Sequence, residues 1–244
     1  MDDKYLLALM YDFYNKNILK GQNDDISYYI KQIANYKSKN VLVVGAGTGR
    51  VAIPLSDYAN ITALDFDKER LTVLKNKCKN IKTICENFLK FESKENYDLI
   101  IIPYSTLQFD CDKIKLKEML KKLRQTMNSL TVSIFDLSES FNSKVDIAHE
   151  LLFRKYCEEI KDEVSVYYTS KRYDEYISFT VKYKLKKLKK ELLEIEKYYY
   201  YNDDLITTLL NETNLELIRL DKGYGNDSFK HKHLFHCRGS YETK

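Results

Sequence analysis

Residues 41–54 read VLVVGAGTGRVAIP, and this stretch decides how the rest of the chain is interpreted. Three of the chain's seven glycines stand at positions 45, 47 and 49, directly after an apolar run. Glycine is required where φ is positive or where something approaches the backbone closely. The run 41–44 has the length of a buried parallel strand, and a helix is expected from Val51, with Pro54 tolerated in its first turn. The stretch therefore predicts a strand, a glycine turn and a helix N-terminus, whose N–H groups can face a polar or anionic ligand.

Outward from this stretch, strand-like apolar runs and helical spacings alternate as far as residue 137. Two helices are expected within residues 4–36, with a break near Gly21, and another helix is expected between the first two strands. The other expected elements are strands 41–44, 61–64, 81–85, 97–102 and 130–137, and helices 68–79 and 113–125. This alternation predicts an α/β protein with a Rossmann-like open, mostly parallel sheet that has helices on both faces.

The pattern changes after the fifth strand, where residues 141–201 are expected to form an antiparallel β insertion. Apolar and polar side chains alternate over residues 177–185, which predicts a strand with one apolar face that includes Phe179, Val181 and Tyr183. Residues 185–195 fit a helix face as well, and a strand over 192–201 is the preferred interpretation. A helix capped by Asn202 or Asp203 and running to Leu210, followed by strands 215–220 and 232–238, completes a seven-stranded sheet.

Length and composition are consistent with one domain, because 244 residues of which 44% are apolar can bury a substantial core. The chain 1–244 is divided into N-terminal helices (1–40), a cofactor-binding half (41–140), the insertion (141–201), and a final helix and strands (202–244). No apolar run of about 18 residues is present, so no membrane span is expected. The acidic, tyrosine-rich start does not resemble a secretory signal, which predicts a cytoplasmic protein.

Neither the net charge nor the spacing of the cysteines indicates a nucleic-acid-binding or a metal-binding protein. The 40 basic residues nearly balance the 36 acidic ones, so composition does not demand a nucleic-acid partner. The lysines between positions 182 and 190 alternate with apolar residues and precede Glu191, Glu194 and Glu196, which predicts a solvated strand face. The five cysteines have no metal-binding spacing and are expected to be reduced thiols.

An acidic residue, Asp65, ends the second expected strand in ITALDFD, where it can accept hydrogen bonds from both hydroxyls of a ribose. Dinucleotide-binding domains combine such a residue with the spacing G-x-G-x-x-G. In this chain the third glycine comes one residue early, and Arg50 occupies the dinucleotide position. S-adenosylmethionine has no pyrophosphate to neutralise, which makes it the alternative ligand. A glycine turn that binds nothing is the remaining interpretation.

The chain resembles the class I S-adenosylmethionine-dependent methyltransferases. The resemblance rests on VLVVGAGTGR, ITALDFD, CENF and YDLIIIPYSTLQF, in that order, and it covers roughly residues 5–137. It is nearest to bacterial small-molecule enzymes of the sugar N-methyltransferase type, which share a Tyr-Asp helix like Tyr11-Asp12 and an antiparallel insertion over the substrate. The resemblance implies transfer of a methyl group from the cofactor S-adenosylmethionine to nitrogen or oxygen of a small polar acceptor.

The resemblance also implies which residues bind the cofactor. Its methionine part is expected at Gly45, Ala46, Gly47 and Gly49, beneath Tyr11 and Tyr14; its ribose at Asp65; its adenine at Phe66, Asn87 and Phe88; and its sulfonium at Pro103 and Tyr104. One departure from the family's pattern is Val43, which stands where an acidic residue usually orders the loop and the cofactor's amino group.

Residues that follow the fourth and fifth strands are the candidates for chemistry, because ligands bind at the carboxyl ends of parallel strands. Tyr104 and Asp136 are the candidate catalytic residues, and Ser105 and Gln108 are expected to contact the acceptor. Asp136 could orient or deprotonate an acceptor, or it could cap the turn that follows. No metal site is expected, since His233 and His236 face opposite ways on a strand.

Several alternatives remain open. The motif Ile102-Pro103-Tyr104 lacks the polar first residue with which enzymes that methylate base amino groups hold the amine, which argues against that acceptor. An RNA or protein acceptor, a modified sulfonium donor paired with Arg50, and a non-catalytic S-adenosylmethionine-binding module are the competing hypotheses. The insertion is expected to set acceptor choice or to form a homodimer contact.

Overall fold

The computed structural model describes residues 2–19, 23–139, 146–224 and 231–240, so the expected break near Gly21 and the start of the expected insertion lie outside the described residues. The helices are α1 (Asp3–Leu19), α2 (Asp24–Asn35), α3 (Ala52–Leu55), α4 (Lys68–Lys77), α5 (Lys113–Thr126) and α6 (Asp203–Glu212). The strands are β1 (Asn40–Val44), β2 (Asn60–Asp65), β3 (Lys82–Cys85), β4 (Leu99–Ile102), β5 (Val132–Ser138), β6 (Ile147–Cys157), β7 (Asp162–Arg172), β8 (Tyr176–Leu185), β9 (Lys190–Tyr199), β10 (Leu215–Lys222) and β11 (Lys232–Gly239).

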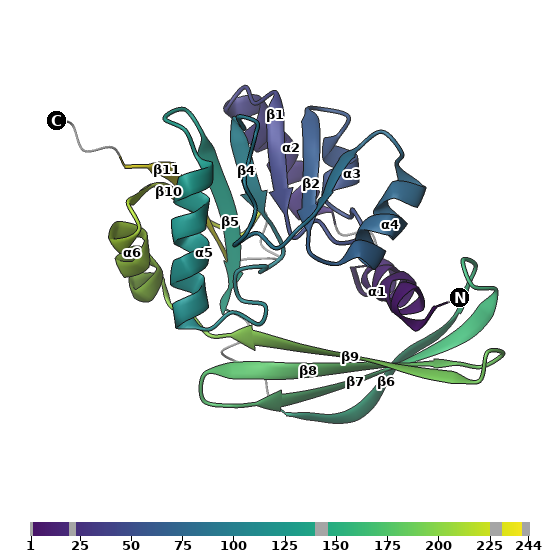
Figure 1. Cartoon of the computed structure of the whole chain (residues 1–244). Coiled ribbons are helices and arrows are strands. Elements are labelled where there is room, and N and C mark those ends of the chain that lie inside the picture. The colour runs from purple at the N-terminus through teal and green to yellow at the C-terminus, as the bar shows by residue number, and fades with distance from the viewer. Residues whose placement is uncertain (1, 20–22, 140–145, 225–230, 241–244) are drawn as a thin grey trace.

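A seven-stranded sheet forms the centre of the molecule, in the order β10-β11-β5-β4-β1-β2-β3 (Figure 1). Its strands pair in parallel except at β11, which is antiparallel to both of its neighbours. The strand order reverses beside β1, which pairs with β2 on one side and β4 on the other. Such a reversal opens a crevice at the carboxyl ends of the strands. The predicted Rossmann-like α/β fold is confirmed.

Helices cover both faces of this sheet, because its central strands are apolar on both sides. Leu42 and Ile100 face a core that includes Leu120 of α5 and Leu209 of α6. Their neighbours along β1 and β4 face a second core, to which Tyr29 of α2, Leu55 of α3 and Leu74 of α4 contribute. The sheet therefore holds the carboxyl ends of β1, β2 and β4 in fixed positions.

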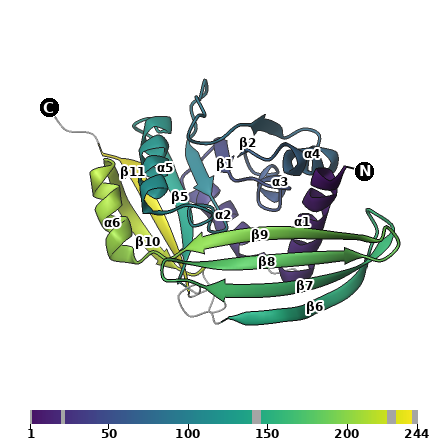
Figure 2. The ribbon, with the colours of Figure 1, turned by 60° about the horizontal axis from the view of Figure 1, so that its bottom comes forward.

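A second sheet of four antiparallel strands, β6-β7-β8-β9, lies across the carboxyl-end side of the first (Figures 1 and 2). We call it the insertion sheet. The apolar face predicted on β8 packs against α1, where Val181 and Tyr183 join a core with Leu6, Met10 and Phe13. Because α1 of the same chain covers this face, it is not available for pairing with another subunit. A homodimer contact through another part of the insertion sheet stays a prediction.

One expectation for these elements needs correction, and two others are confirmed. The helix after the glycine turn is a single turn, α3, which ends where Ser56 Oγ donates to the carbonyl of Ile53 at 2.6 Å. The insertion has strand structure from Ile147, because β6 pairs antiparallel with β7, although its sequence shows little alternation. The ambiguous stretch after Leu185 is a turn and then strand β9, as preferred.

Candidate functional site

The glycine turn follows β1 at the crevice, and each of its three glycines has a positive φ: 70° at Gly45, 53° at Gly47 and 90° at Gly49. A side chain would also be crowded at two of them. A Cβ on Gly45 would lie 2.7 Å from the Thr106 side chain, and one on Gly49 would lie 2.8 Å from Ile53 and Leu74. The glycines are therefore required by the backbone and by packing, apart from any ligand.

The N–H groups of the turn are largely bonded within the chain, contrary to the expectation that they face a ligand. Gly45 and Ala46 both donate to the carbonyl of Leu64, and Gly49 donates to the carbonyl of Ala46. The N–H of Gly47 donates to Asp65 Oδ2 at 2.7 Å. The turn thus closes onto the end of β2, which fixes its shape before anything binds.

Asp65 is the link between the turn and the crevice. Its Oδ1 accepts from the N–H of Asp67 at 2.9 Å, while burial raises the pKa of its carboxyl despite these two backbone bonds. Each carboxylate oxygen has a second lone pair, so Asp65 can still accept hydrogen bonds from a ligand. The Asp67 side chain caps α4 by accepting from the N–H groups of Glu69 and Arg70, which fixes where α4 begins after the end of β2.

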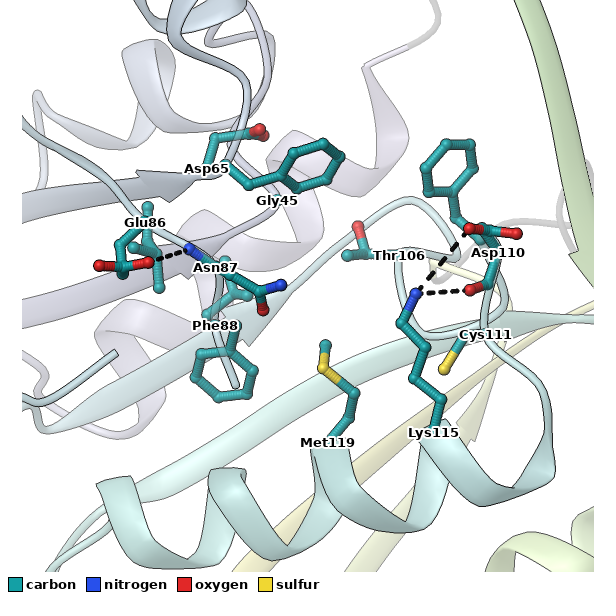
Figure 3. A pocket seen from close by; sticks show the side chains of 14 residues that line it. Gly45, Asp65, Glu86, Asn87, Phe88, Thr106, Asp110, Cys111, Lys115 and Met119 are labelled. Atoms are coloured by element: carbon teal, nitrogen blue, oxygen red, sulfur yellow. Dashed lines mark hydrogen bonds and ion pairs between the residues drawn. The ribbon is translucent and has the colours of Figure 1, made fainter. Parts of the chain in front are cut away.

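A cavity of about 280 Å³ lies beside Asp65 (Figure 3). It is lined by Gly45, Asp65, Phe66, Asn87, Phe88 and residues of the loop and helix after β4, including Thr106, Phe109 and Met119. Phe66 is 66% exposed, whereas Phe88 is 5% exposed. Lys115 closes the far end, where its Nζ donates to the carbonyl of Asp110 at 2.6 Å. The four residues expected at ribose and adenine thus border one apolar slot.

A narrow cavity of about 30 Å³ continues from Gly45 along the glycine turn. Its lining includes the expected residues Tyr11, Ala46, Gly47, Pro103 and Tyr104, together with Asn15, Thr48, Arg50 and Val51. Helix α1 is tied to the turn here, because Thr48 Oγ1 donates to Asp12 at 2.6 Å. The guanidinium of Arg50 forms a bidentate ion pair with the carboxylate of Asp25, with N–O distances of 2.5 and 3.1 Å.

A third cavity, of about 200 Å³, lies between α1 and the insertion sheet. It shares Tyr11, Asn15 and Tyr104 with the narrow cavity. Its other lining residues are Tyr14, Ile18, Tyr168, Phe179, Val181, Glu194, Glu196 and Tyr198. Tyr14, expected over the methionine part of the cofactor, lines this third cavity. The three cavities form one series that runs from Asp65 past the glycine turn to the insertion sheet.

The solvated face was predicted for the lysines that precede Glu194 and Glu196, and these two glutamates lie on the opposite face of the sheet from Lys182 and Lys184. Glu194 is only 8% exposed, and both side chains point into the third cavity. The strand period of two places them on the same face of β9 as Leu192 and Tyr198, which turns toward the protein. This alternation was a signal in the sequence that could have found them.

Asp136 is fully buried, which contradicts the expectation that it is open to an acceptor. Its Oδ2 lies 2.8 Å from Lys232 Nζ and accepts from the N–H of Ser105 at 3.1 Å, and its Oδ1 accepts from the Tyr29 hydroxyl at 3.3 Å. Lys232 also donates to Ser105 Oγ at 2.6 Å. Tyr104 and Ser105 are both held at positive φ, 61° and 58°, so this network fixes a strained loop at the crevice.

Gln108 is also buried, and both the nitrogen and the oxygen of its side-chain amide form hydrogen bonds with backbone groups. Its Nε2 donates to the carbonyls of Ser138 and Tyr199 at 3.2 and 3.1 Å, and its Oε1 accepts from the N–H of Ser138 at 2.7 Å. The expected contact between Gln108 and an acceptor is therefore not supported by its geometry. Gln108 joins the loop after β4 to the ends of β5 and β9.

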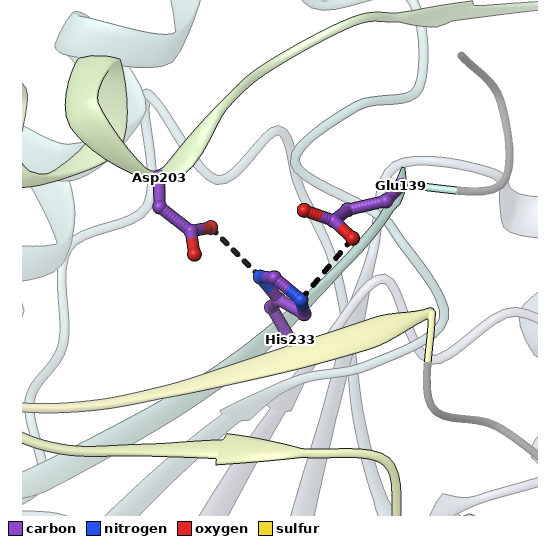
Figure 4. A group of neighbouring side chains, drawn as sticks. All are labelled: Glu139, Asp203 and His233. Atoms are coloured by element: carbon purple, nitrogen blue, oxygen red, sulfur yellow. Dashed lines mark hydrogen bonds and ion pairs between the residues drawn. The ribbon is translucent and has the colours of Figure 1, made fainter.

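The histidines of β11 face opposite sides, as predicted. His233 Nδ1 lies 2.8 Å from Asp203 Oδ1 and its Nε2 lies 3.3 Å from Glu139 Oε2 (Figure 4). His236 packs on the other face, where the Tyr28 hydroxyl lies 2.6 Å from its Nε2. Each ring nitrogen of His233 therefore lies beside a carboxylate, Asp203 at the start of α6 and Glu139 directly after β5.

Comparison with known proteins agrees with this geometry. A family model described as a methyltransferase domain matches residues 41–129, which carry the glycine turn, Asp65 and the loop after β4. No sequence among curated proteins matches the chain.

No helix in the described ranges is both long and apolar enough to cross a membrane.

Solved structures match the fold over nearly the whole chain. An S-adenosylmethionine-dependent methyltransferase from Clostridium acetobutylicum ATCC 824 has 17% identity and a TM-score of 0.79, over 95% of this chain and 98% of that one. The sugar N-methyltransferase KedS8 from Streptoalloteichus sp ATCC 53650 has 12% identity and a TM-score of 0.78, over 95% and 93%. DesVI of Streptomyces venezuelae has 12% identity and a TM-score of 0.75, over 94% and 97%.

Residues 41–129 therefore carry a methyltransferase domain, and the chain has the fold of solved S-adenosylmethionine-dependent methyltransferases. The methyltransferase domain and the fold predicted from the motifs are confirmed.

Proposed function

We propose that this protein transfers a methyl group from S-adenosylmethionine to a small polar acceptor that occupies the third cavity. The observation that carries the proposal is the series of cavities, in which Tyr11, Asn15 and Tyr104 border both the glycine turn and the space beneath the insertion sheet. A donor whose ribose is at Asp65 and whose methionine part follows the glycine turn would direct its sulfonium toward these three shared residues.

Methyl transfer requires an in-line approach of the acceptor's lone pair to the carbon bound to sulfur. The sulfonium is already a strong electrophile, so positioning supplies much of the acceleration. Tyr104 stands between the two cavities and is held by its strained backbone and by a 3.3 Å hydrogen bond from its hydroxyl to Asn15. These contacts support a role for Tyr104 in aligning the methyl group and the acceptor.

The structural neighbours support a small-molecule acceptor, because two of them are the sugar N-methyltransferase KedS8 and CalS10, an amino pentose methyltransferase. A modified sulfonium donor paired with Arg50 has less support, since Asp25 already occupies that guanidinium. RNA and protein acceptors remain the alternatives that a macromolecular substrate screen would detect. The cytoplasmic location and a homodimer stay predictions.

Calorimetric titration with S-adenosylhomocysteine and with NAD tests the donor site. We expect the sulfur compound to bind and NAD not to bind, because the glycine spacing differs from that of pyrophosphate-binding dinucleotide domains. Asp65→Ala should weaken binding by about 1–3 kcal/mol, since the ribose loses a charged acceptor. Asp57→Ala is the matched control on the exposed turn before β2 and should bind normally. Binding of NAD alone, or unchanged affinity in Asp65→Ala, would contradict the assignment.

A further inference from the structure

The third cavity has an unusual combination of groups. Five tyrosines, Tyr11, Tyr14, Tyr104, Tyr168 and Tyr198, line it together with two carboxylates on adjacent inward positions of β9. Aromatic faces and carboxylates both attract a cation. The chemistry of the lining therefore favours an acceptor that carries a positive charge, such as an amine in its ammonium form.

The two carboxylates have different surroundings. Glu194 forms an ion pair with Arg70 and accepts from the Tyr183 hydroxyl at 3.2 Å. Arg70 also lies 3.6 Å from Asp67 and stacks over the Tyr11 ring, with its Cζ 3.8 Å from the ring centre. Glu194 is thus part of the contact that holds α4, α1 and β9 together, and its charge is compensated within the protein.

Glu196 is the carboxylate left for a ligand. Its side-chain hydrogen bond within the described part of the chain comes from the Tyr198 hydroxyl at 3.2 Å, and no described cation forms a salt bridge with it. Arg70 is shared between Glu194 and Asp67, so the two cavity carboxylates together exceed the positive charge beside them. A cationic ligand next to Glu196 would balance this charge.

We propose that Glu196 is a catalytic residue, which anchors the ammonium group of an amine acceptor and then removes its proton. This inference rests on the proposed function, because it assigns the acceptor class and the base of that same site. The acceptor ammonium gives a proton to the Glu196 carboxylate, and the freed lone pair attacks the methyl carbon. The C–S bond breaks with its electrons going to sulfur, which leaves neutral S-adenosylhomocysteine and a methylated ammonium product, and Glu196 later releases its proton to water.

The titration behaviour of the cavity is suited to this role. Burial and the nearby charge of Glu194 raise the pKa of Glu196 to about 7, against the opposing effects of Arg70 and the Tyr198 hydrogen bond. A base with a pKa near the working pH is effective in proton transfer. Burial raises the pKa of the surrounding tyrosines, Tyr11 and Tyr14 of α1, Tyr104, Tyr168 of β7, Tyr183 of β8 and Tyr198 of β9. These hydroxyls stay protonated at neutral pH and do not compete as bases.

Binding of a matched pair of probes tests the anchoring step. In the complex with S-adenosylhomocysteine, cyclohexylamine should bind at least about tenfold more tightly than cyclohexanol, a neutral molecule of the same shape, by calorimetry at pH 8. This preference should disappear in Glu196→Gln and remain in Glu191→Gln, which removes an exposed carboxylate from the outer face of the same strand. In the wild type the preference should weaken as the pH falls below about 7, where Glu196 becomes neutral.

Turnover tests the proton-transfer step. With S-adenosylmethionine and cyclohexylamine, kcat/KM should fall by about 10²-fold in Glu196→Gln, and Glu196→Asp should restore part of it. The wild-type decline in kcat/KM below about pH 7 should be absent from Glu196→Gln. An amine that binds without being methylated, or a pH profile shared by both proteins, would overturn this step.

The outcomes also separate this inference from the proposed function. If S-adenosylhomocysteine does not bind to the wild type, the proposed function itself fails. If S-adenosylhomocysteine binds but the amine shows no advantage over the alcohol, or keeps that advantage in Glu196→Gln, the role of Glu196 is wrong while the donor site stands. Unchanged S-adenosylhomocysteine affinity in Glu196→Gln shows that the variant is folded.

Discussion

At the scale of single residues, the glycines of the turn are required for two reasons that the sequence does not distinguish: a positive φ, and a lack of space for a side chain. Gly45 and Gly47 share positive φ values, yet only Gly45 is crowded by a neighbouring side chain. That neighbour, Thr106, is fixed, because its Oγ1 donates to the carbonyl of Pro103 at 2.6 Å. A Cβ on Gly47 would make an ordinary contact with Tyr11 at 3.7 Å.

We therefore expect Gly45→Ala and Gly47→Ala to differ in their effects on stability. Each should lose about 1–2 kcal/mol of unfolding free energy, because a left-handed conformation is unfavourable for alanine. Gly45→Ala should lose about 1–3 kcal/mol more, since the new methyl group overlaps Thr106. Urea unfolding measures both values. The double variant Gly45→Ala/Thr106→Ala serves as the control, and it should recover part of the additional loss if crowding is its cause.

At the scale of elements, the buried pair of Asp136 and Lys232 joins β5, β11 and the loop after β4. The pair spans 2.8 Å, and the side chain of Lys232 is 11% exposed while that of Asp136 is fully buried. Its further bonds to Ser105 hold that residue and its neighbour Tyr104 at the crevice. The pair therefore affects the site by positioning the loop after β4.

Removing one partner of this pair should cost more than removing both. Asp136→Asn and Lys232→Met should each lower the free energy of unfolding by about 3–5 kcal/mol, because each leaves a buried charge without its partner. The double variant should lose less than either single variant, and therefore much less than the sum of the two, which a double-mutant cycle in urea measures. Losses that add would mean that the two side chains do not interact. Ser133, buried on β5 away from the pair, offers Ser133→Ala as a control.

The elements also show what the sequence could predict and what it could not. The glycine turn, Asp65 and the parallel strands depend on local patterns, because each needs only its own residues and a few neighbours. Lys232 was missed as a partner of Asp136, since β11 reaches β5 only through the folded sheet. Asp136 and Gln108 were wrongly expected to be open to an acceptor, because burial from distant strands is not visible in the local sequence.

At the scale of the whole molecule, the insertion sheet places an electrostatically unfavourable carboxylate, Glu196, beside the third cavity. Glu196 is ionised in the unfolded chain above its ordinary pKa, whereas in the folded protein its pKa lies near 7. The folded state therefore binds an additional proton between about pH 4.5 and 7, so the cost of this residue to stability is largest above pH 7 and disappears toward pH 4.5.

Glu196→Gln should accordingly be more stable than the wild type at high pH. The advantage should reach up to about 3 kcal/mol at pH 8, which corresponds to the difference between the folded and unfolded pKa values, and it should decrease to near zero by pH 4.5. Urea unfolding at several pH values measures it, with Glu191→Gln as the control. A constant difference between the two proteins at every pH would show that Glu196 has an ordinary pKa in the fold.

The edge of β9 has a consequence for how the two ligands bind. Phe109 and Asp110 line the cavity beside Asp65, and Tyr198 lines the cavity beneath the insertion sheet. Phe109 pairs with Tyr198 in a β-bridge, and the N–H of Asp110 donates to the carbonyl of Lys197 at 2.8 Å. A ligand that orders one of these segments also orders the other. Donor and acceptor are therefore expected to bind cooperatively, and thermodynamic linkage requires each to raise the affinity for the other by the same factor.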